Sequence, residues 1–337
     1  MKIGILTFSK SPSYGATLQC YALCKIVRDL GHTPFLIKNK LPHESNLKYQ
    51  IRFLISCRNF ISFKKKFFPR FINTISGLDL VIVGSDQVWN PDLTGTNSLC
   101  FFGDYPQVHI PFIAYAASFG RNVWEHDELE TRVSNLLHNH FKAISVREKS
   151  GIEICQKTFG VNASFVLDPT LLVGCFDELA INIKISNGFA SFKLHEPLDF
   201  NWQKMLTMVA NRTNSPHTEL SCIPNNKFYT VTSVENWLSV IASSHFLLTD
   251  SFHGMLMAIK YHKPFIVFRP ISGREGRVKE FLEMLHLEDR YCADFTENKY
   301  NLIIDKLNKK IDYETVEKQM SVLRSQSMDF LKKSITL

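Results

Sequence analysis

Short apolar runs alternate with stretches of helical periodicity along most of the chain. Residues 2–8 form a nearly continuous apolar run, which predicts a central parallel strand. A helix over 16–30, ended by Gly31, and a strand over 33–37 complete a first β–α–β unit. The same pattern then predicts strands at 78–83, 110–116, 143–146 and 164–167, with helices at 125–138 and from 147 onward.

The pattern is weak between 171 and 229 and becomes clear again further on. Beyond 170 the predicted elements are strand-like pieces at 181–185 and 190–194, helices near 202–210, from Thr232 and from Ser272, and two amphipathic helices within 293–334. The alternation of strands and helices, with a weak join near 170, predicts an α/β fold. We expect two doubly wound, Rossmann-like domains that face a cleft.

The segment 245–268 predicts a strand, a tight turn, a helix and a second strand. Asp250 or Ser251 can cap the helix over 252–260, and Pro264 stops it before the strand at 265–268. The first helical turn of such a unit lies at the carboxyl edge of a parallel sheet, where ligands bind. His253 falls in that turn, on a helix end whose free N–H groups attract anions. The segment therefore predicts an imidazole presented to an anionic ligand.

Composition narrows the class of protein. Of the 337 residues, 45% are hydrophobic and 21% charged, which describes a folded protein and excludes a disordered one. A net charge of +7 suits an acidic small substrate or an anionic membrane surface better than nucleic acid, so no nucleic-acid partner is expected. The only dense basic run is Lys64 to Lys66, with Arg70 close by. A solvated helix face is the simpler interpretation of this run, and contact with lipid headgroups or a lipid-linked substrate is the alternative.

Cysteine usage and the absence of long apolar runs indicate a cytoplasmic protein. The eight cysteines are scattered and show no zinc spacing, so we expect free thiols and no metal site. The amino terminus predicts a strand and not a signal peptide, and no apolar run reaches the ~18 residues that span a bilayer. Membrane contact would be peripheral at most, at the inner face.

Polar residues follow the predicted strand at 78–83. Asp86 is a candidate general base, Gln87 and Asn90 are candidate hydrogen-bonding groups, and Trp89 is a candidate stacking platform for a sugar. Taken singly, each of these residues more often structures a loop than binds a substrate. Gly15, at a helix start, allows a ligand to approach the backbone, although a simple tight turn explains it equally well.

Three arginines are candidates for binding an anion. Arg147 follows a strand, where its guanidinium can hold a carboxylate or phosphate, or can pair with Glu148 instead. Arg274 and Arg277 lie three residues apart on one helical face, with Arg269 nearby. The region around Arg274 and Arg277 is the densest candidate anion site in the chain.

Together these motifs resemble the polysaccharide pyruvyl transferase family. The resemblance rests on residues 14–23 (YGATLQCYAL), 84–90 (GSDQVWN), 145–148 (SVRE), 167–171 (LDPTL), 249–254 (TDSFHG) with 263–265 (KPF), and 274–285. Each motif is weak alone, but their order along the chain is specific. The matches cover most of the chain except about 175–230.

The resemblance implies a glycosyltransferase-B-like fold and a defined reaction. The implied domains are 1–172 on the acceptor side, 173–310 on the phosphoenolpyruvate side, and a carboxyl-terminal helix over 311–337 that packs back. The implied reaction moves the enolpyruvyl carbon of phosphoenolpyruvate onto two sugar hydroxyls, leaving a cyclic pyruvate ketal and phosphate. Phosphoenolpyruvate is the donor substrate, and the acceptor is a sugar that is lipid-linked, nucleotide-linked or polymeric. No cofactor or metal is implied.

Residue roles carry over motif by motif. His253 matches the histidine proposed in the family as general acid, Arg147 an arginine that binds phosphoenolpyruvate, and Asp86 the region of an acidic catalytic group. Many relatives have an arginine two residues before the histidine, where this chain has Ser251. Arg274 or Arg277 could supply the missing contact.

Two other functions fit the same residues. A nucleotide-sugar glycosyltransferase would share the fold and the basic site but would bind a nucleoside diphosphate. A non-catalytic scaffold of polysaccharide assembly would account for Ser251, whereas the presence of His253, Arg147 and Asp86 together argues for an enzyme.

Overall fold

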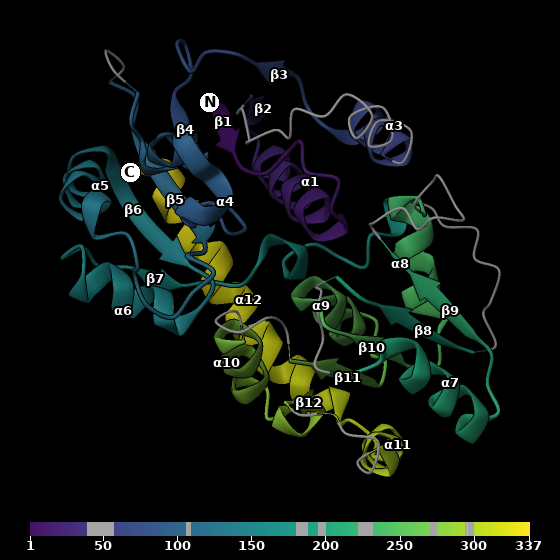
Figure 1. Cartoon of the computed structure of the whole chain (residues 1–337). Coiled ribbons are helices and arrows are strands. Elements are labelled where there is room, and N and C mark those ends of the chain that lie inside the picture. Colours follow the sequence, from purple (N-terminus) through teal and green to yellow (C-terminus); the bar gives the residue numbers. More distant parts are fainter. Residues whose placement is uncertain are drawn as a thin grey trace. The chain divides into compact units, whose positions relative to one another are not determined.

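The computed structural model describes residues 1–38, 57–105, 109–179, 188–194, 200–221, 232–269, 275–293, 295 and 300–337. The chain divides into two compact units (Figure 1). The first unit contains residues 1–50, 64–173 and 320–337, and the second contains 51–63 and 174–319. The division passes through helix α3 (Arg58–Phe67).

The first unit is built on a seven-stranded, all-parallel sheet in the order β3-β2-β1-β4-β5-β6-β7. Its strands are β1 (Lys2–Leu6), β2 (Thr33–Ile37), β3 (Phe71–Ile72), β4 (Leu80–Val83), β5 (Phe112–Ala117), β6 (Phe141–Val146) and β7 (Ser164–Phe165). The chain leaves β1 toward β2 on one side and later returns to β4 on the other. The carboxyl ends of β1 and β4 therefore form the point where the strand order reverses, which is where doubly wound sheets bind ligands.

Helices cover both faces of this sheet because connections between parallel strands are right-handed. The chain moves across the sheet in one direction from β1 to β2 and in the opposite direction from β5 to β7. The helices between these strands therefore lie on opposite faces, α1 on one and α5 and α6 on the other (Figure 1). The helical elements of the unit are α1 (Tyr14–Asp29), α4 (Pro91–Thr94), the 3-10 helix η1 (Gly95–Phe102), α5 (Asp127–His140), α6 (Lys149–Lys157) and the 3-10 turn η2 (Pro169–Leu171).

The second unit repeats the design with five parallel strands in the order β12-β11-β10-β8-β9. Its strands are β8 (Phe189–Phe192), β9 (His217–Leu220), β10 (Leu247–Thr249), β11 (Phe265–Phe268) and β12 (Tyr291–Cys292). Here the order reverses between β8 and β10. Thr249 of β10 is level with Phe192 of β8 and Val267 of β11, so these three strands end at one edge.

The helices of the second unit follow from the same crossover rule. They are α7 (Trp202–Thr213), α8 (Val234–Ser243), α9 (Phe252–Lys260), α10 (Gly276–Met284) and α11 (Tyr300–Asn308), with 3-10 turns η3 (Asp177–Leu179) and η4 (Glu288–Arg290). One hydrophobic core joins α7, the sheet and α11 through Phe189, Met205, Leu248, Ile266 and Ile303.

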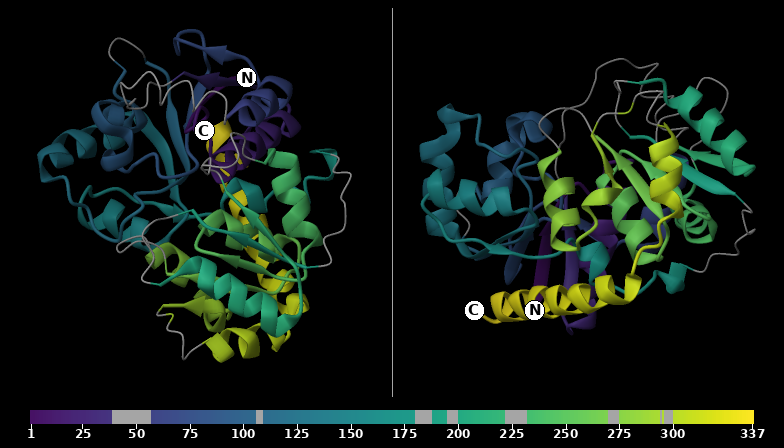
Figure 2. Two further views of the ribbon diagram at one scale, coloured as in Figure 1. Left: turned by 45° about the vertical axis from the view of Figure 1, so that its right-hand side comes forward. Right: turned by 90° about the horizontal axis from the view of Figure 1, so that it is seen from below.

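The chain ends in the long helix α12 (Tyr313–Thr336), seen along its length in Figure 2. Within the first unit, Ser327 of this helix accepts a hydrogen bond from the Leu167 backbone N–H at 2.9 Å. Arg324 donates to the Leu171 carbonyl at 3.0 Å. No helix in the described part of the chain is long and apolar enough to cross a bilayer.

The sequence-based elements agree with the structure in order and type, and the strands 33–37 and 265–268 and the helix 252–260 have the predicted bounds. The predicted helix near 232 begins one residue late, since Ser233 and not Thr232 caps it and accepts from Asn236 N at 3.1 Å. The strand-like piece at 181–185 and the capping box at Ser272 lie outside the described residues; α10 itself begins at Gly276.

Three strands were not predicted, namely β3, β9 and β12. Two of them have only two residues each, and β9 reads His-Thr-Glu-Leu, which is mostly polar. All three lie at the edges of their sheets, where a strand pairs on one side only and needs no apolar run. Apolar periodicity therefore carries little information about them.

Candidate active site

The turn between β10 and α9 places polar side chains at the switch point of the second sheet. Thr249 Oγ1 donates to the Phe192 carbonyl at 2.7 Å, and Asp250 Oδ1 accepts from the Leu194 backbone N–H at 2.6 Å. Both bonds tie the end of β10 to the end of β8. Thr249, Asp250 and Ser251 are buried, so the turn is held rigidly against the sheet.

Ser251 caps helix α9 as one of the two predicted alternatives. Its hydroxyl accepts a hydrogen bond from the Gly254 backbone N–H at 3.2 Å, which satisfies one of the donors left open at a helix start. Gly254 is required here because a Cβ on it would lie 2.7 Å from Thr249 Oγ1. The helix can therefore approach the end of β10 closely.

His253 is the second residue of α9, at the carboxyl edge of the sheet. Its imidazole is half-buried, whereas Phe252 before it is buried and packs edge-on against the imidazole ring, with ring centres 5.7 Å apart. The side chain thus stands at a helix end where backbone N–H groups favour negative charge.

Arg277 occupies the equivalent place on the neighbouring helix. It is the second residue of α10, which follows β11 as α9 follows β10. The Arg277 guanidinium lies over the Phe252 ring, with Cζ 5.3 Å from its centre, and the side chain is 8% exposed. Phe252 therefore contacts both Arg277 and His253, and two helix starts with a cation and an imidazole share one sheet edge.

The corresponding edge of the first unit is arranged differently. Arg147, predicted to hold a substrate anion, is 3% exposed and lies between two aspartates. Its Nη2 is 2.9 Å from Asp86 Oδ1, and its Nη1 is 2.6 Å from Asp168 Oδ2. Burial alone would lower the pKa of Arg147, but the charges of Asp86 and Asp168 raise it above its ordinary value. The guanidinium is thus a permanently charged centre of a buried network.

Hydrogen bonds extend this network to neighbouring strands. Asp168 accepts from the Thr170 backbone N–H at 3.0 Å and from its hydroxyl at 2.8 Å. Ser85 Oγ donates to the Ala116 carbonyl at 2.9 Å and to Asp168 at 3.3 Å. Asp168 was not among the predicted site residues, although it follows β7 as Arg147 follows its neighbour β6. That shared position at adjacent strand ends is the signal that could have paired them.

Gln19 closes the switch point of the first sheet from the side of α1. Its amide donates to Thr7 Oγ1 at 2.9 Å, and its carbonyl oxygen accepts from the Ser85 backbone N–H at 3.1 Å. Thr7 in turn donates to the Ser85 carbonyl at 2.8 Å. These three residues tie the end of β1 to the end of β4. Gly15, in the first turn of α1, is buried, and its proposed role in ligand approach stays a prediction.

The remaining residues of the 84–90 motif lie in or near the core of the first unit. Trp89 is fully buried, stacks on Phe102 with ring centres 5.5 Å apart, and donates to the Phe101 carbonyl at 2.9 Å. A ring in this place packs in the core, and its role as a stacking platform for a sugar stays a prediction. Asn90 caps α4 by accepting from Asp92 N at 3.1 Å.

Gln87 lies beside Asn90, whose amide nitrogen is 3.4 Å from Gln87 Oε1. Gly120 (φ +70°) makes room for this contact, because a Cβ there would fall 2.1 Å from Gln87 Oε1. Gln87 and Asn90 thus contact each other within the loop, and their roles in binding a substrate stay predictions.

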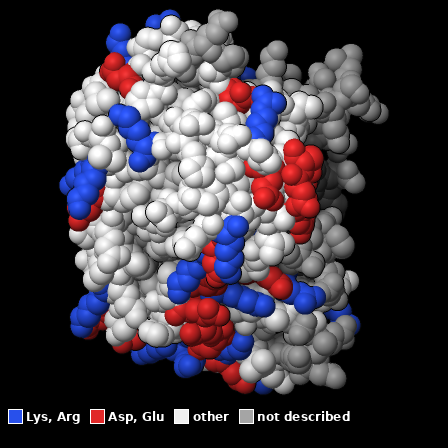
Figure 3. All heavy atoms as spheres, turned by 90° about the vertical axis from the view of Figure 1, so that its left-hand side faces the viewer, with Lys and Arg blue, Asp and Glu red and all other residues white. Residues whose placement is uncertain are grey.

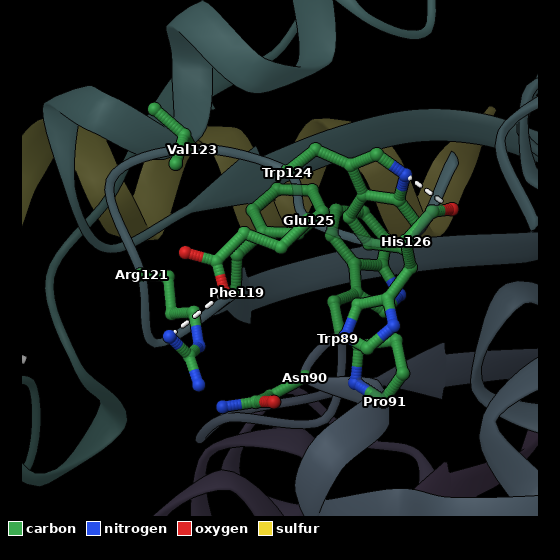
Figure 4. A pocket seen from close by; sticks show the side chains of 9 residues that line it. All are labelled: Trp89, Asn90, Pro91, Phe119, Arg121, Val123, Trp124, Glu125 and His126. Atoms are coloured by element: carbon green, nitrogen blue, oxygen red, sulfur yellow. Dashed lines mark hydrogen bonds and ion pairs between the residues drawn. The ribbon is translucent and has the colours of Figure 1, made fainter. Parts of the chain in front are cut away.

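A shallow hollow adjoins this motif in the first unit (Figure 4). It is lined by Trp89, Asn90, Pro91, Phe119, Arg121, Val123, Trp124, Glu125 and His126. Arg121 at its rim pairs with Asp92 and Glu125, each at 2.8 Å. The polar groups at the rim are thus engaged with one another.

Arg274 lies outside the described residues, so its role in binding an anion stays a prediction. In the described part of the chain, no three His, Cys, Asp or Glu side chains gather as metal ligands would. The expectation of a reaction without a metal stays a prediction. The seven cysteines described are free thiols.

Solved structures share the fold at low sequence identity. UDP-GlcNAc 2-epimerase from Neisseria meningitidis bound to UDP-GlcNAc aligns over 100% of both chains, with 13% identity and a TM-score of 0.55. S. aureus MnaA with UDP aligns over 95% of this chain and 91% of that one, with 14% identity and a TM-score of 0.53. The spinosyn rhamnosyltransferase SpnG aligns over 100% of both chains, with 9% identity and a TM-score of 0.50. These neighbours establish a glycosyltransferase-B-type fold of two Rossmann-like domains, as predicted.

Comparison with curated proteins gives no match. The family model for polysaccharide pyruvyl transferase, in contrast, matches residues 14–272, which include the buried Arg147 network and His253 and end before Arg277. This match confirms the resemblance seen in the ordered motifs. The chain belongs to the polysaccharide pyruvyl transferase family.

Proposed function

We propose that this protein transfers the enolpyruvyl carbon of phosphoenolpyruvate to two hydroxyls of a sugar in a polysaccharide precursor. The product is a cyclic pyruvate ketal, and phosphate is released. The observation that carries the proposal is the pairing of His253 and Arg277 at the starts of neighbouring helices on one sheet edge. We assign this edge as the donor site.

The chemistry of phosphoenolpyruvate explains why such an edge suits it. The molecule carries a phosphate and a carboxylate, and helix starts and arginine side chains are the groups that bind such anions. Two helix starts and Arg277 supply these groups, and Ser251 adds a hydroxyl. Arg277 takes the role that an arginine at position 251 has in many relatives.

His253 is the proposed general acid. In the reaction, a proton adds to the methylene carbon of phosphoenolpyruvate while a sugar hydroxyl attacks the adjacent carbon. A second hydroxyl then displaces phosphate, so one hydroxyl proton ends up on the new methyl group and the other on phosphate. An imidazole is suited to deliver the first proton near neutral pH. The charge of the bound donor would favour the protonated imidazole and so prepare the acid for the reaction.

Arg147 and Asp86 have a different place in the proposal. Both take part in a buried network in which the guanidinium contacts two carboxylates. An arginine held in this way has little capacity for a third anion, so we propose that it positions the loop that starts at Gly84. A direct catalytic role for Asp86 would require it to leave Arg147.

The acceptor is proposed to be a sugar, free or lipid-linked, and the reaction to take place in the cytoplasm or at the inner membrane face. The test is incubation with phosphoenolpyruvate and a panel of free and lipid-linked galactosides, glucosides and mannosides. We expect one acceptor to gain the mass of pyruvate less one water, with one phosphate released per ketal. Phosphate release without a mass gain on any acceptor would contradict ketal transfer.

A nucleotide-sugar glycosyltransferase is the competing function, because two proteins of similar fold were solved with UDP or UDP-GlcNAc. Thermal-shift measurements separate the two functions. We expect phosphoenolpyruvate to raise the melting temperature and UDP to leave it unchanged. Stabilisation by UDP alone would favour glycosyl transfer.

A further inference from the structure

The positive charge of the chain is concentrated in one segment. Between Glu44 and Asp79 the sequence contains seven lysines and arginines and no acidic residue. The whole chain has 39 basic and 32 acidic residues, so the rest of the sequence has 32 of each and is balanced. The net charge of +7 therefore belongs entirely to this segment. The structure describes its second part, from residue 57 onward, which contains helix α3.

Helix α3 has one buried and one exposed face. Phe60 and Phe63 are buried, at 1% and 2% exposure, and Lys64 and Phe67 on the same side are half-buried. The exposed positions recur at the helical spacing of three and four residues and are Arg58, Ile61, Ser62, Lys65 and Lys66. The apolar face of the helix is thus used for packing, and its basic face is turned to solvent.

The cations of the exposed face differ from Lys64 in their contacts. Lys64 Nζ donates to the Ser11 carbonyl at 2.7 Å, within the first unit. In contrast, none of the described acidic groups forms a salt bridge with Arg58, Lys65, Lys66 or Arg70. The Lys66 ammonium lies 4.7 Å from the centre of the Phe67 ring. We call Arg58, Lys65 and Lys66 of α3, Arg70 three residues beyond its end, and Ile61 the basic face of α3.

Several exposed lysines elsewhere in the described chain pair with acidic side chains. On the face shown in Figure 3, acidic and basic side chains lie next to one another. Lys157 of α6 pairs with Glu153, and Lys318 of α12 pairs with Glu314. Paired charges of opposite sign give no net attraction to a large anionic surface. Four cations on a short segment, in contrast, attract such a surface.

We propose that the basic face of α3 docks on a membrane surface that contains anionic phospholipid. Clusters of four to eight exposed Lys and Arg residues on or beside an amphipathic helix bind anionic headgroups; here three lie on α3 and the fourth, Arg70, follows it. Ile61 is 50% exposed within this face, and an apolar side chain among cations suits the boundary between headgroups and acyl chains. Docking would hold the enzyme where a lipid-linked sugar acceptor is concentrated.

Nucleic acid is a weaker match for the same face. Single strands need exposed aromatic rings on which bases stack, and Phe67 and Phe68 next to the lysines are half-buried. Phe67 also packs edge-on against Tyr21 of α1, with ring centres 5.9 Å apart. These rings are engaged within the protein, so charge and one aliphatic side chain are what the face presents.

Co-sedimentation with vesicles tests the proposal. The vesicles are phosphatidylcholine alone, or phosphatidylcholine with about one-third phosphatidylglycerol. Since each basic residue at an anionic surface changes the binding constant about fivefold, the triple variant Lys65→Gln/Lys66→Gln/Arg70→Gln should bind the anionic vesicles about a hundredfold more weakly. Binding of the wild type should also fall as added salt shortens the screening length.

A matched control removes the same number of charges elsewhere. Lys157→Gln/Lys318→Gln/Lys332→Gln changes three exposed lysines on other helices and should bind like the wild type. Melting temperatures of both triple variants establish that they are folded, and Lys65→Glu/Lys66→Glu provides a second disruption of the basic face.

Three results would overturn the proposal. They are equal binding of both triple variants, no preference of the wild type for phosphatidylglycerol, and tighter binding to a single-stranded oligonucleotide than to the vesicles. Sedimentation needs no turnover, so its outcome is independent of the proposed pyruvyl transfer.

Discussion

The two sheets of this protein have the same winding but use their carboxyl edges differently. At the edge of the first sheet, Arg147 is buried between Asp86 and Asp168, so one cation is shared by two carboxylates. At the edge of the second sheet, a half-buried His253 and the cation Arg277 stand at two helix starts and contact one phenylalanine. The first edge is thus occupied by a buried network of ion pairs, whereas the second is where we propose that the anionic donor binds.

This difference shows that position at a strand end does not by itself assign a role to a side chain. Arg147 and Arg277 both lie just beyond a parallel strand, where ligands bind in this fold. They differ in their observed contacts. Two aspartates pair with the Arg147 guanidinium, whereas the guanidinium of Arg277, in the first turn of α10, lies over the Phe252 ring. On this basis we propose Arg277, and not Arg147, as the ligand of the donor.

The largest expected effect is that of removing the proposed acid. His253→Ala should lower kcat for ketal formation about 10²- to 10⁴-fold, the range that general acids contribute. The fold should persist, because the imidazole is half-buried and Ser251 still caps the helix. The measurement is phosphate release from phosphoenolpyruvate with acceptor present. His245→Ala, at an exposed histidine of the same unit, is the control and should retain wild-type turnover. A near-normal rate in His253→Ala would remove His253 from the mechanism.

The second-largest expected effect is a loss of stability when the ion pairs at the carboxyl edge of the first sheet are broken. Arg147→Met should lower the free energy of unfolding by about 3–5 kcal/mol, since it leaves two buried carboxylates without their cation. Urea denaturation followed by circular dichroism measures this loss. Arg132→Met is the matched control, because Arg132 is 60% exposed and pairs with Asp104 at the surface, and it should change stability by less than about 1 kcal/mol. Equal stability losses in the two variants would mean that the Arg147 network is not what holds this edge.

A smaller effect is expected at Arg277, and it should appear in substrate affinity. Arg277→Met should raise the KM for phosphoenolpyruvate about 10- to 100-fold, since a charge-assisted hydrogen bond contributes about 1.5–3 kcal/mol. Arg277→Lys should restore part of the affinity through its charge alone. Arg212→Met, at an exposed position on α7, should leave KM unchanged. An unchanged KM in Arg277→Met would show that the cation stabilises Phe252 without binding the donor.

The smallest effect separates two serines that cap helices in the same unit. Ser251→Ala and Ser233→Ala should each lower stability by about 1 kcal/mol, because each removes one helix cap. Only Ser251→Ala should also raise the KM for phosphoenolpyruvate, since Ser233 lies at the start of α8 and away from the proposed donor site. Thermal unfolding and steady-state kinetics measure the two quantities. Equal KM values would limit Ser251 to its capping role.

The sequence predicted the central elements of both sheets well, and the physical reason is burial. Strands such as β1, β4 and β11 are enclosed on both faces, so they appear as continuous apolar runs. The helix after β10 could be bounded at Phe252–Lys260 because a capping residue precedes it and Pro264 follows it. Edge strands such as β9 carry no such signal, since only part of their surface is covered.

Site residues were predicted less completely because their roles depend on neighbours from distant parts of the chain. The place of His253 at a helix start followed from local spacing alone. In contrast, the partner of Arg147 is 21 residues away at Asp168 and 61 residues away at Asp86, and only the strand order brings the three together. Trp89 illustrates the same limit, since its aromatic ring follows a strand as a binding platform would but packs on Phe102 in the core.

The most direct test is calorimetric titration of phosphoenolpyruvate into three proteins: the wild type, Arg277→Met and Arg147→Lys. The central claim, that the donor binds at the edge of the second sheet, predicts that Arg277→Met loses at least about tenfold in affinity. Arg147→Lys, provided that it is folded, should bind as the wild type does. The reverse pattern, with affinity lost in Arg147→Lys and retained in Arg277→Met, would place the donor at the first edge and contradict the account.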